Sequence, residues 1–393
     1  MPRALARFAV PLLLLALLLA GCDLGNEETR PPQPGAPADT EQGTEPGIPS
    51  AATRNTVRVG GSDEAADAAG VANALYPSPG DGERPTAVAL VDQDDWVTGI
   101  AASVLAGPPI GAPLLLSDGD ELPDATNETL ERLDPSGSDL SRDAQVIRLG
   151  PTVPRPEGFR TALVEGDNSF ERAAAIDRFF SAARGRPSND VVLYSAESAE
   201  WAMPAAAWAG RSGDAVLPVR ATTIPAPIRK ALAAHERPNV YLLGPSRIIS
   251  ARVAAQLERD DLASSVDRIE GPTPVENAIA FARYDKGDFG WGITVPGYNF
   301  TVANLSRPQN AVAASSLATR GVFAPLLLTD QAANVPKALE DYFLSVQPGY
   351  EEDPGEAVYN RAWILGDEEA ISLRQQAQID RITELVPVEA TAP

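Results

Sequence analysis

The sequence is poor in the residues on which most catalytic and metal-binding sites depend. Its 393 residues include one cysteine, Cys22, and one histidine, His235. A single cysteine cannot form an intramolecular disulfide, and one cysteine with one histidine cannot form a Cys/His metal cluster. No Gly-x-Ser-x-Gly sequence, typical of one class of serine hydrolases, precedes His235. We therefore expect no such metal site and no cysteine or serine nucleophile, and for His235 contacts with carbonyl groups at a helix end.

Lysine is also scarce, and acidic residues outnumber basic ones. Lysine occurs only at Lys230, Lys286 and Lys337, and the formal net charge is −22. Loss of Arg3 and Arg7 with the N-terminal signal would leave −24 (−22 − 2). Binding of nucleic acid requires clustered basic side chains that neutralise phosphates. The composition therefore argues against a nucleic-acid partner.

Phosphate-binding glycine loops are missing as well. Gly60-Gly61 precedes a predicted helix, but no further glycine and no Gly-Lys-Ser/Thr sequence follows. A strand–helix pattern without such a loop does not predict nucleotide binding. We expect no cofactor.

The first 22 residues form an export signal. Arg3 and Arg7 precede an apolar run, residues 8–20, that is too short to span a bilayer of about 30 Å. The run ends in Leu19-Ala20-Gly21-Cys22, which resembles the lipobox of bacterial lipoproteins, whose cysteine is lipidated and becomes the mature N-terminus. An ordinary secretory signal that ends in cysteine is the alternative. Residues 23–55 are rich in Pro, Gly, Glu and Thr, which predicts a disordered tether.

The remaining chain repeats one pattern three times. The copies begin at Arg58-Val-Gly-Gly61, Leu163-Val-Glu-Gly166 and Arg268-Ile-Glu-Gly271, so that the aligned glycines lie 105 residues apart. An Ala-rich helical run follows each glycine. The strands expected after these runs are 86–92, 113–118 and 146–150 in repeat 1, 190–196, 215–220 and 240–244 in repeat 2, and 291–297, 325–330 and 362–366 in repeat 3. We set the repeats at 56–162, 163–267 and 268–388, followed by a tail at 389–393.

Helical and strand patterns alternate within each repeat, which predicts an α/β fold with parallel sheets. The strands are continuous apolar runs rather than alternating ones, as expected where helices cover both faces of a sheet. The third repeat carries an extra loop, 347–359, that is rich in Glu, Pro and Gly and is expected to project from the surface.

These features resemble the type 2 cell-wall-binding repeat, which occurs in threes on surface proteins of Gram-positive bacteria. The resemblance rests on the Arg-x-x-Gly start, a central helix of small residues, Ala112-Pro-Leu-Leu-Leu116, Ala324-Pro-Leu-Leu-Leu328 and the closing Ile-Leu-Gly366. Repeat 2 departs from it at Leu163 and in the broken strand 214–218. The resemblance implies tandem Rossmann-like repeats in a pseudo-threefold arrangement. It also implies non-covalent attachment to anionic polymers of the cell wall.

A ligand is expected at the edge where the parallel strands end, because loops and helix N-termini gather there. The predicted ligand-binding residues are Asp92, Asp95, Trp96, Ser117, Trp201, Arg220, Asn299, Asn304 and Thr329. Aromatic residues recur near the start of the central helix, at Trp96, Trp201 and Phe300. They either stack on a sugar ring or pack in the core. Three such edges would make binding multivalent.

Asp and Glu are the potentially catalytic side chains that are abundant in the sequence. Asp92, Asp94 and Asp95 follow a predicted strand, and Glu197 and Glu200 occupy the matching region of repeat 2. A glycosidase needs two carboxylates, but no spacing identifies an acid and its partner. A divalent cation could bind among the aspartates, although the turn glycine and final glutamate of an EF-hand are missing. We expect helix caps and a solvated loop here, and no metal.

We therefore expect a lipid-anchored protein on the extracytoplasmic face of the cell membrane, associated with the wall. Its repeats would bind a wall polymer or glycan, and it would not be an enzyme. Because like charges repel within about 8 Å at physiological salt, an anionic polymer would require bridging divalent cations or local arginines. One alternative is an envelope scaffold or solute-binding lipoprotein that has lost polymer binding. Another is a carboxylate-based wall hydrolase.

The Cys22→Ala variant tests the lipid anchor, because alanine has no thiol to acylate. We expect the variant in the medium or as an uncleaved precursor, as measured by cell fractionation and mass spectrometry of the N-terminus. Unchanged membrane association, with the same N-terminus in both forms, would contradict the lipobox.

Overall fold

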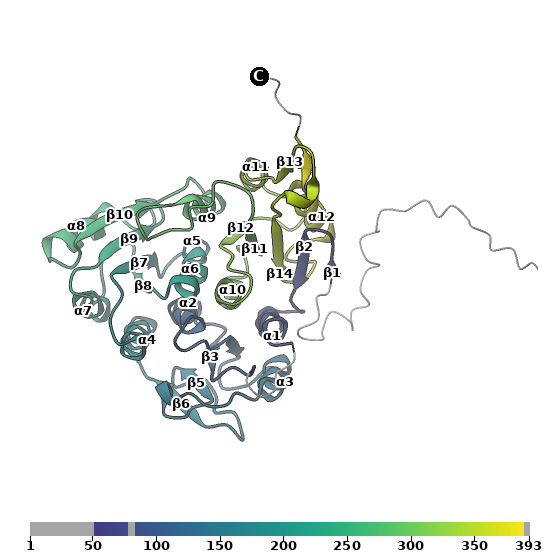
Figure 1. The fold of residues 1–393 in the computed structure, drawn as a ribbon. Helices are drawn as coiled ribbons and strands as arrows, with labels where there is room; N and C mark the ends of the chain where they lie inside the picture. The colour runs from purple at the N-terminus through teal and green to yellow at the C-terminus, as the bar shows by residue number, and fades with distance from the viewer. Residues whose placement is uncertain (1–50, 78–82, 389–393) are drawn as a thin grey trace, which may run out of the picture. The chain divides into compact units, whose positions relative to one another are not determined.

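The computed structural model describes residues 51–77 and 83–388 (Figure 1). The predicted signal with Cys22, the tether up to residue 50 and the tail 389–393 lie outside the described residues. In the part that is described, no helix is long and apolar enough to cross a membrane. Ala51–Ala52, which we expected at the end of the disordered tether, instead form strand β1, because they pair antiparallel with the next strand.

Within these ranges, three larger sheets carry the fold, and their strands run parallel apart from β1. The first sheet has the order β4 (Leu114–Ser117), β3 (Val88–Asp92), β5 (Val146–Leu149), β6 (Thr161–Val164); the second has β8 (Ala215–Val219), β7 (Asp190–Ser195), β9 (Asn239–Leu243), β10 (Ser265–Ile269); and the third has β12 (Leu326–Thr329), β11 (Asn299–Asn304), β14 (Arg361–Leu365), β2 (Thr56–Val59), β1. A short parallel pair, β13 (Gly349–Tyr350) and β15 (Val386–Pro387), lies in the third repeat. The α/β fold with Rossmann-like parallel sheets is confirmed.

Helices alternate with these strands in each repeat. They are α1 (Glu64–Leu75), α2 (Trp96–Ala102) and α3 (Asp124–Leu133) in repeat 1; α4 (Ser169–Arg184), α5 (Ala199–Ala202), α6 (Pro204–Ser212), α7 (Ala226–Ala234) and α8 (Ala251–Arg259) in repeat 2; and α9 (Pro274–Arg283), α10 (Gln309–Thr319), α11 (Lys337–Ser345) and α12 (Leu373–Ile382) in repeat 3. The helices α2, α6 and α10 pack against one another (Figure 1). Gly210 permits this close packing, because a Cβ there would lie 2.6 Å from the carbonyl oxygen of Ser315.

Each sheet takes a strand from the repeat that follows it. Strand β6, which crosses the predicted boundary into repeat 2, pairs with β5, and β10, which crosses the boundary into repeat 3, pairs with β9. Strand β2, which opens repeat 1, pairs with β14 of repeat 3. The exchange therefore joins the three repeats in a closed ring. The sheets are offset by one strand from the repeats at 56–162, 163–267 and 268–388, and these sequence boundaries stay a prediction.

A buried guanidinium fixes β2 in the third sheet. Arg58 donates to the carbonyl oxygens of Gly366, Asp367 and Ile371, at 2.6, 2.8 and 2.5 Å, and to Oε1 of Gln376 at 3.0 Å. Burial lowers the pKa of Arg58 to about 10, so the side chain is still charged at neutral pH. The first arginine of the repeat pattern is thus bonded to the loop after β14.

In the other two sheets an arginine also donates to carbonyl oxygens that follow a strand, but it comes from different positions. Arg268 on β10 donates to the carbonyl oxygen of Gly244 at 2.6 Å. Leu163 stands at this position on β6, and its register partner on β5 is Arg148. The Arg148 guanidinium donates to the carbonyl oxygen of Val153 at 2.5 and 2.9 Å. The guanidinium that repeat 2 lacks is therefore supplied by the neighbouring strand.

The repeated glycine lies at the turn from the exchanged strand into the next helix. A Cβ on Gly61 would lie 2.3 Å from Cβ of Ala66, and one on Gly271 would lie 2.4 Å from the backbone nitrogen of Asn277. A larger residue would displace the helix. The N-caps of these helices, also 105 residues apart, are Asp63, Asn168 and Thr273. Each accepts a hydrogen bond from a backbone N–H of the first turn.

Equivalent positions at the contacts between repeats carry Asp67, Arg172 and Asn277. Arg172 forms an ion pair with Asp95 of repeat 1 at 2.6 Å. Asp67 has the opposite sign and lies 3.6 Å from the guanidinium of Arg307 in repeat 3. Burial raises the pKa of Asp67 to about 7, against the effect of its hydrogen bond from the Gly61 N–H. These two charged contacts between repeats are therefore not interchangeable.

The prediction of a strand at residues 291–297 in repeat 3 is wrong. Residues 291–297 are irregular, and β11 begins at Asn299. Gly290, Gly292 and Gly297 have φ of 113, 62 and 108°, which interrupts extended backbone. Phe300 consequently lies inside β11, fully buried, and not at the start of the central helix.

Candidate functional site

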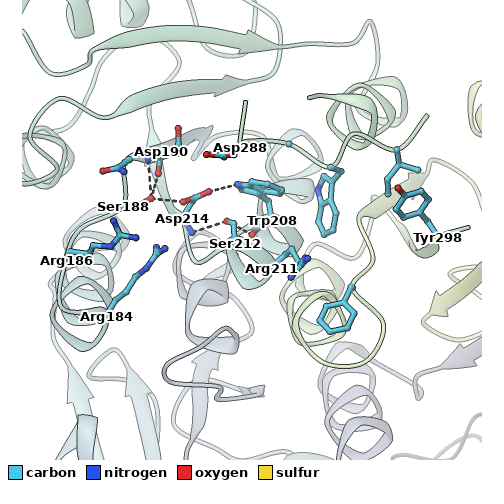
Figure 2. A pocket seen from close by; sticks show the side chains of 15 residues that line it. Arg184, Arg186, Ser188, Asp190, Trp208, Arg211, Ser212, Asp214, Asp288 and Tyr298 are labelled. Carbon is cyan, nitrogen blue, oxygen red and sulfur yellow. Dashed lines mark hydrogen bonds between the residues drawn. The ribbon is translucent and has the colours of Figure 1, made fainter. Parts of the chain in front are cut away.

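A pocket of about 590 Å³ lies between repeats 2 and 3 (Figure 2). Its walls come from the ends of α4 and α6, the starts of β7 and β8, and the irregular segment before β11. It is lined by Arg184, Arg186, Ser188, Asn189, Asp190, Trp208, Arg211, Ser212, Asp214, Asp288, Gly290, Trp291, Ile293, Tyr298 and Phe323. The pocket thus lies at the edge where the strands of the second sheet begin, opposite the edge that we predicted from the sequence.

Aromatic rings form one part of the pocket wall. Trp208 of α6 lies 5.6 Å from Trp291 and 4.8 Å from Phe289, measured between ring centroids. Phe289 is buried and stacks on Tyr241 of β9 at 3.5 Å. This stack fixes the irregular segment to the second sheet. Trp291 and Tyr298, from the same segment, remain partly exposed at the pocket.

The carboxylates at the floor of the pocket are held by internal donors. Asp214 accepts hydrogen bonds from the Ser188 hydroxyl at 2.7 Å and from the Trp208 indole N–H at 3.0 Å (Figure 2). Burial raises the pKa of Asp214, and the hydrogen bond from Ser188 works in the opposite direction. Asp190 accepts from the Asn239 amide at 3.0 Å and the Tyr241 hydroxyl at 3.3 Å. Both carboxylates therefore already accept hydrogen bonds from within the fold.

The arginines of the pocket are less constrained. Arg184 donates to the carbonyl oxygen of Gly213 at 2.9 Å. The Arg211 guanidinium lies 5.1 Å from the centre of the Phe323 ring. Among the described residues, Arg186 and Arg211 have no carboxylate partner. Figure 2 places Arg184 and Arg186 on one side of the pocket and Tyr298 on the other, with Trp208 and Asp214 between them.

A buried histidine supports the pocket from behind. Nε2 of His235 donates to the Asp177 carboxylate at 3.0 Å, and Nδ1 donates to the carbonyl oxygen of Ser188 at 2.8 Å. Both ring nitrogens therefore face acceptors, which the imidazolium form satisfies together. The predicted contact with helix-end carbonyl groups is wrong, because the ring reaches from the end of α7 to α4 and to the loop before β7.

Some of the predicted ligand-binding residues shape the turns after the strands. Oxygens of Asp92 and Asn304 accept from the backbone N–H two residues later, at 3.1 and 3.0 Å. Ser195 makes the same contact in repeat 2, at 3.1 Å. Asp95 caps α2 through the N–H of Thr98, and it also forms the ion pair with repeat 2. These side chains are used in folding and in the contacts between repeats.

Others of the predicted residues are buried. Ser117 and Thr329 are fully buried at strand ends, and Gln375 donates to the Thr329 hydroxyl at 2.7 Å. Trp201 is 5% exposed, with the Arg247 guanidinium 4.9 Å from its ring centroid. Trp96 is half-buried against the core.

Arg220 and Asn299 complete the predicted set. The Arg220 side chain is 57% exposed, lies 3.8 Å from Glu197 and covers the Phe170 ring. Asn299 stands at the beginning of β11, and its amide donates to the carbonyl oxygen of Val322 at 2.9 Å. Its predicted place at the end of the strand is wrong, because the strand was set eight residues too early. Asn299 therefore does not lie at a strand-end edge.

No group of three or more metal-ligating side chains comes together in residues 51–77 and 83–388. The loop that contains Asp92, Asp94 and Asp95 lies within these residues. Its Asp95 carboxylate forms an ion pair with Arg172.

No protein-family model matches the chain, and no curated protein matches it. Among solved structures, Cwp8 from Clostridium difficile is similar with a TM-score of 0.62 at 20% identity, over 84% of this chain and 51% of Cwp8. Cwp6 from Clostridium difficile is similar with a TM-score of 0.64 at 16% identity, over 84% of this chain and 47% of Cwp6. Both are cell wall proteins. The chain spans about half the length of each, and the likeness is one of fold.

The His235–Asp177 pair predicts a pH-dependent contribution to stability. Burial disfavours the imidazolium, but the hydrogen bond and charge of Asp177 outweigh it and raise the pKa of His235 above 6.5. The contribution is therefore complete below pH 6.5 and is lost as the pH rises through the raised pKa. We expect His235→Gln to lower the free energy of unfolding by roughly 3 kcal/mol at pH 6.

Urea unfolding of both proteins between pH 5.5 and 9 measures this effect. Their difference in free energy should shrink as the pH rises, and no other histidine contributes, since the sequence has one. A difference that is constant over this range would show that the pair is not charged.

Proposed function

We propose that this chain is a cell-envelope protein that attaches non-covalently to a polymer or glycan of the cell wall. The observation that carries the proposal is the extent of the likeness to Cwp8 and Cwp6, which covers 84% of this chain. Both neighbours are cell wall proteins. The chain would then belong with the type 2 cell-wall-binding repeats that its sequence resembles.

The proposed role is binding rather than catalysis. Of the carboxylates considered for a hydrolase, Asp92 holds a turn, and Asp95 holds a helix cap and an ion pair. His235 is buried behind the pocket with both nitrogens engaged. Side chains occupied in this way support a scaffold that presents a surface to a ligand.

The proposed anchor is a lipid on Cys22. The lipobox and the Pro-, Gly- and Glu-rich sequence of residues 23–50 support an arrangement in which the repeats are held within reach of the wall by a tether. The alternative is a solute-binding lipoprotein without affinity for the polymer. One observation favours it, namely the pocket of about 590 Å³, since pockets of roughly 300–1,000 Å³ suit small ligands.

Co-sedimentation of the purified protein with isolated cell walls tests the proposal. We expect the protein to pellet with intact walls and to stay in solution with walls from which the accessory polymers have been extracted. A parallel series with a chelator tests whether divalent cations bridge the acidic chain and the anionic wall polymer. If they do, the chelator should lower the retention of the chain on the walls.

The matched control is the same protein kept unfolded by urea throughout the sedimentation, which shares its charge but lacks the ring of repeats. Equal recovery of the folded protein with intact and extracted walls, or no recovery with either, would reject polymer attachment and favour the solute-binding alternative.

A further inference from the structure

We propose that the pocket between repeats 2 and 3 binds a sugar that carries a phosphate or carboxylate group. The inference rests on the proposed function, because it names the class of wall ligand and the site that takes it. The site differs from the strand-end edge in that its wall combines aromatic rings, arginines without carboxylate partners and one free carboxylate.

The aromatic wall suits the apolar face of a sugar ring. Trp291 and Tyr298 are partly exposed, and Trp208 stands behind Trp291 at 5.6 Å. A large flat ring gives contact area at little entropic cost, and its segment is already held by the stack of Phe289 on Tyr241. The rings are therefore positioned before any ligand arrives.

The charges of the pocket select an anionic ligand. Asp214 and Asp190 accept hydrogen bonds from neutral donors within the fold, which occupy their oxygens. The guanidinium groups of Arg186 and Arg211 form no ion pair with a described residue and are free to pair with a ligand. A guanidinium offers paired N–H donors that match the oxygens of a phosphate or a carboxylate. A negative group would therefore bind on this side of the pocket.

Asp288 supplies an acceptor for hydroxyl groups. It is exposed on the pocket wall, and no described residue forms a hydrogen bond or ion pair with its carboxylate. Figure 2 places it across the pocket from Arg184 and Arg186. A ligand with hydroxyl groups at one end and a negative group at the other would match this polarity.

The aromatic wall also predicts one site per chain. It requires Trp208 on α6, whereas the central helix α10 of repeat 3 contains no aromatic residue. It also requires the segment that contains Trp291, which follows α9 in repeat 3. The site thus arises from differences between the repeats and not from their symmetry.

Calorimetric titration of the purified chain tests the inference. The probes are N-acetylglucosamine 1-phosphate, glucuronate, neutral N-acetylglucosamine and inorganic phosphate. We expect at least one anionic sugar to bind with a stoichiometry of one, about tenfold or more tightly than the neutral sugar and than phosphate alone. The phosphate and carboxylate arms identify which anion is preferred.

Variants localise the binding to the pocket. Arg211→Gln, Arg186→Gln and Trp291→Leu should each weaken binding of the preferred sugar by about tenfold. The matched control is Arg252→Gln, an exposed arginine on α8 outside the pocket, which should bind as the unchanged chain does. Circular dichroism of each variant establishes that the fold is retained.

The outcomes separate the two proposals. If the chain binds an anionic sugar, the variants lose that binding and walls do not retain the chain, the pocket is supported and wall attachment is rejected. Walls that retain the chain while no anionic sugar binds would reject the pocket and leave attachment in place. Equal binding of neutral and anionic sugars, or three sites per chain, would each overturn the inference.

Discussion

The pairing of β2 with β14 is the interaction on which the rest of the structure depends. Each of the three larger sheets is completed by a strand from the start of another repeat, and β2 is the strand that returns from the beginning of the described chain to repeat 3. Its four residues bring main-chain hydrogen bonds and the buried guanidinium of Arg58, which reaches three carbonyl groups. Without this strand, β14 would be an open edge, and those carbonyl groups would lose their donor.

The same topology explains why polar contacts between repeats differ. Opposite charges at equivalent positions, Asp67 and Arg172, find partners of opposite sign in neighbouring repeats. An exchange of partners would bring like charges together, so these contacts favour one order around the ring. Where the neighbouring repeats instead meet through aromatic rings around Trp208, a pocket is left between them.

Much of the fold could be predicted because the repeated signals are local. The apolar runs Leu114–Ser117 and Leu326–Thr329 are strands as expected, and the repeated glycine lies at a turn too crowded for a Cβ. The exchange of strands could not be predicted, because periodicity does not show which sheet a strand joins. Short runs such as Thr56–Val59, with β-branched residues, indicate strands and say nothing about their neighbours.

The candidate site was less accessible to sequence analysis. The predicted residues were chosen for the strand-end edge, where buried side chains such as Ser117 and Trp201 turned out to serve the fold. The pocket combines residues about 80 positions apart, such as Trp208 and Trp291, and their proximity follows from how repeats 2 and 3 pack. In repeat 3, three glycines with positive φ interrupt the predicted strand. The strand therefore begins at Asn299, and Asn299 does not follow its end as predicted.

Native-state hydrogen exchange of the backbone amides of residues 56–59 tests the closed ring most directly. If β2 is a full member of the third sheet, these amides should exchange as slowly as those of β14, and only through global unfolding. The equivalent strands β6 and β10 provide internal comparisons. Exchange of residues 56–59 at the rate of exposed loops, while β14 stays protected, would contradict the account, because the three sheets would then be stable without the strand that closes them.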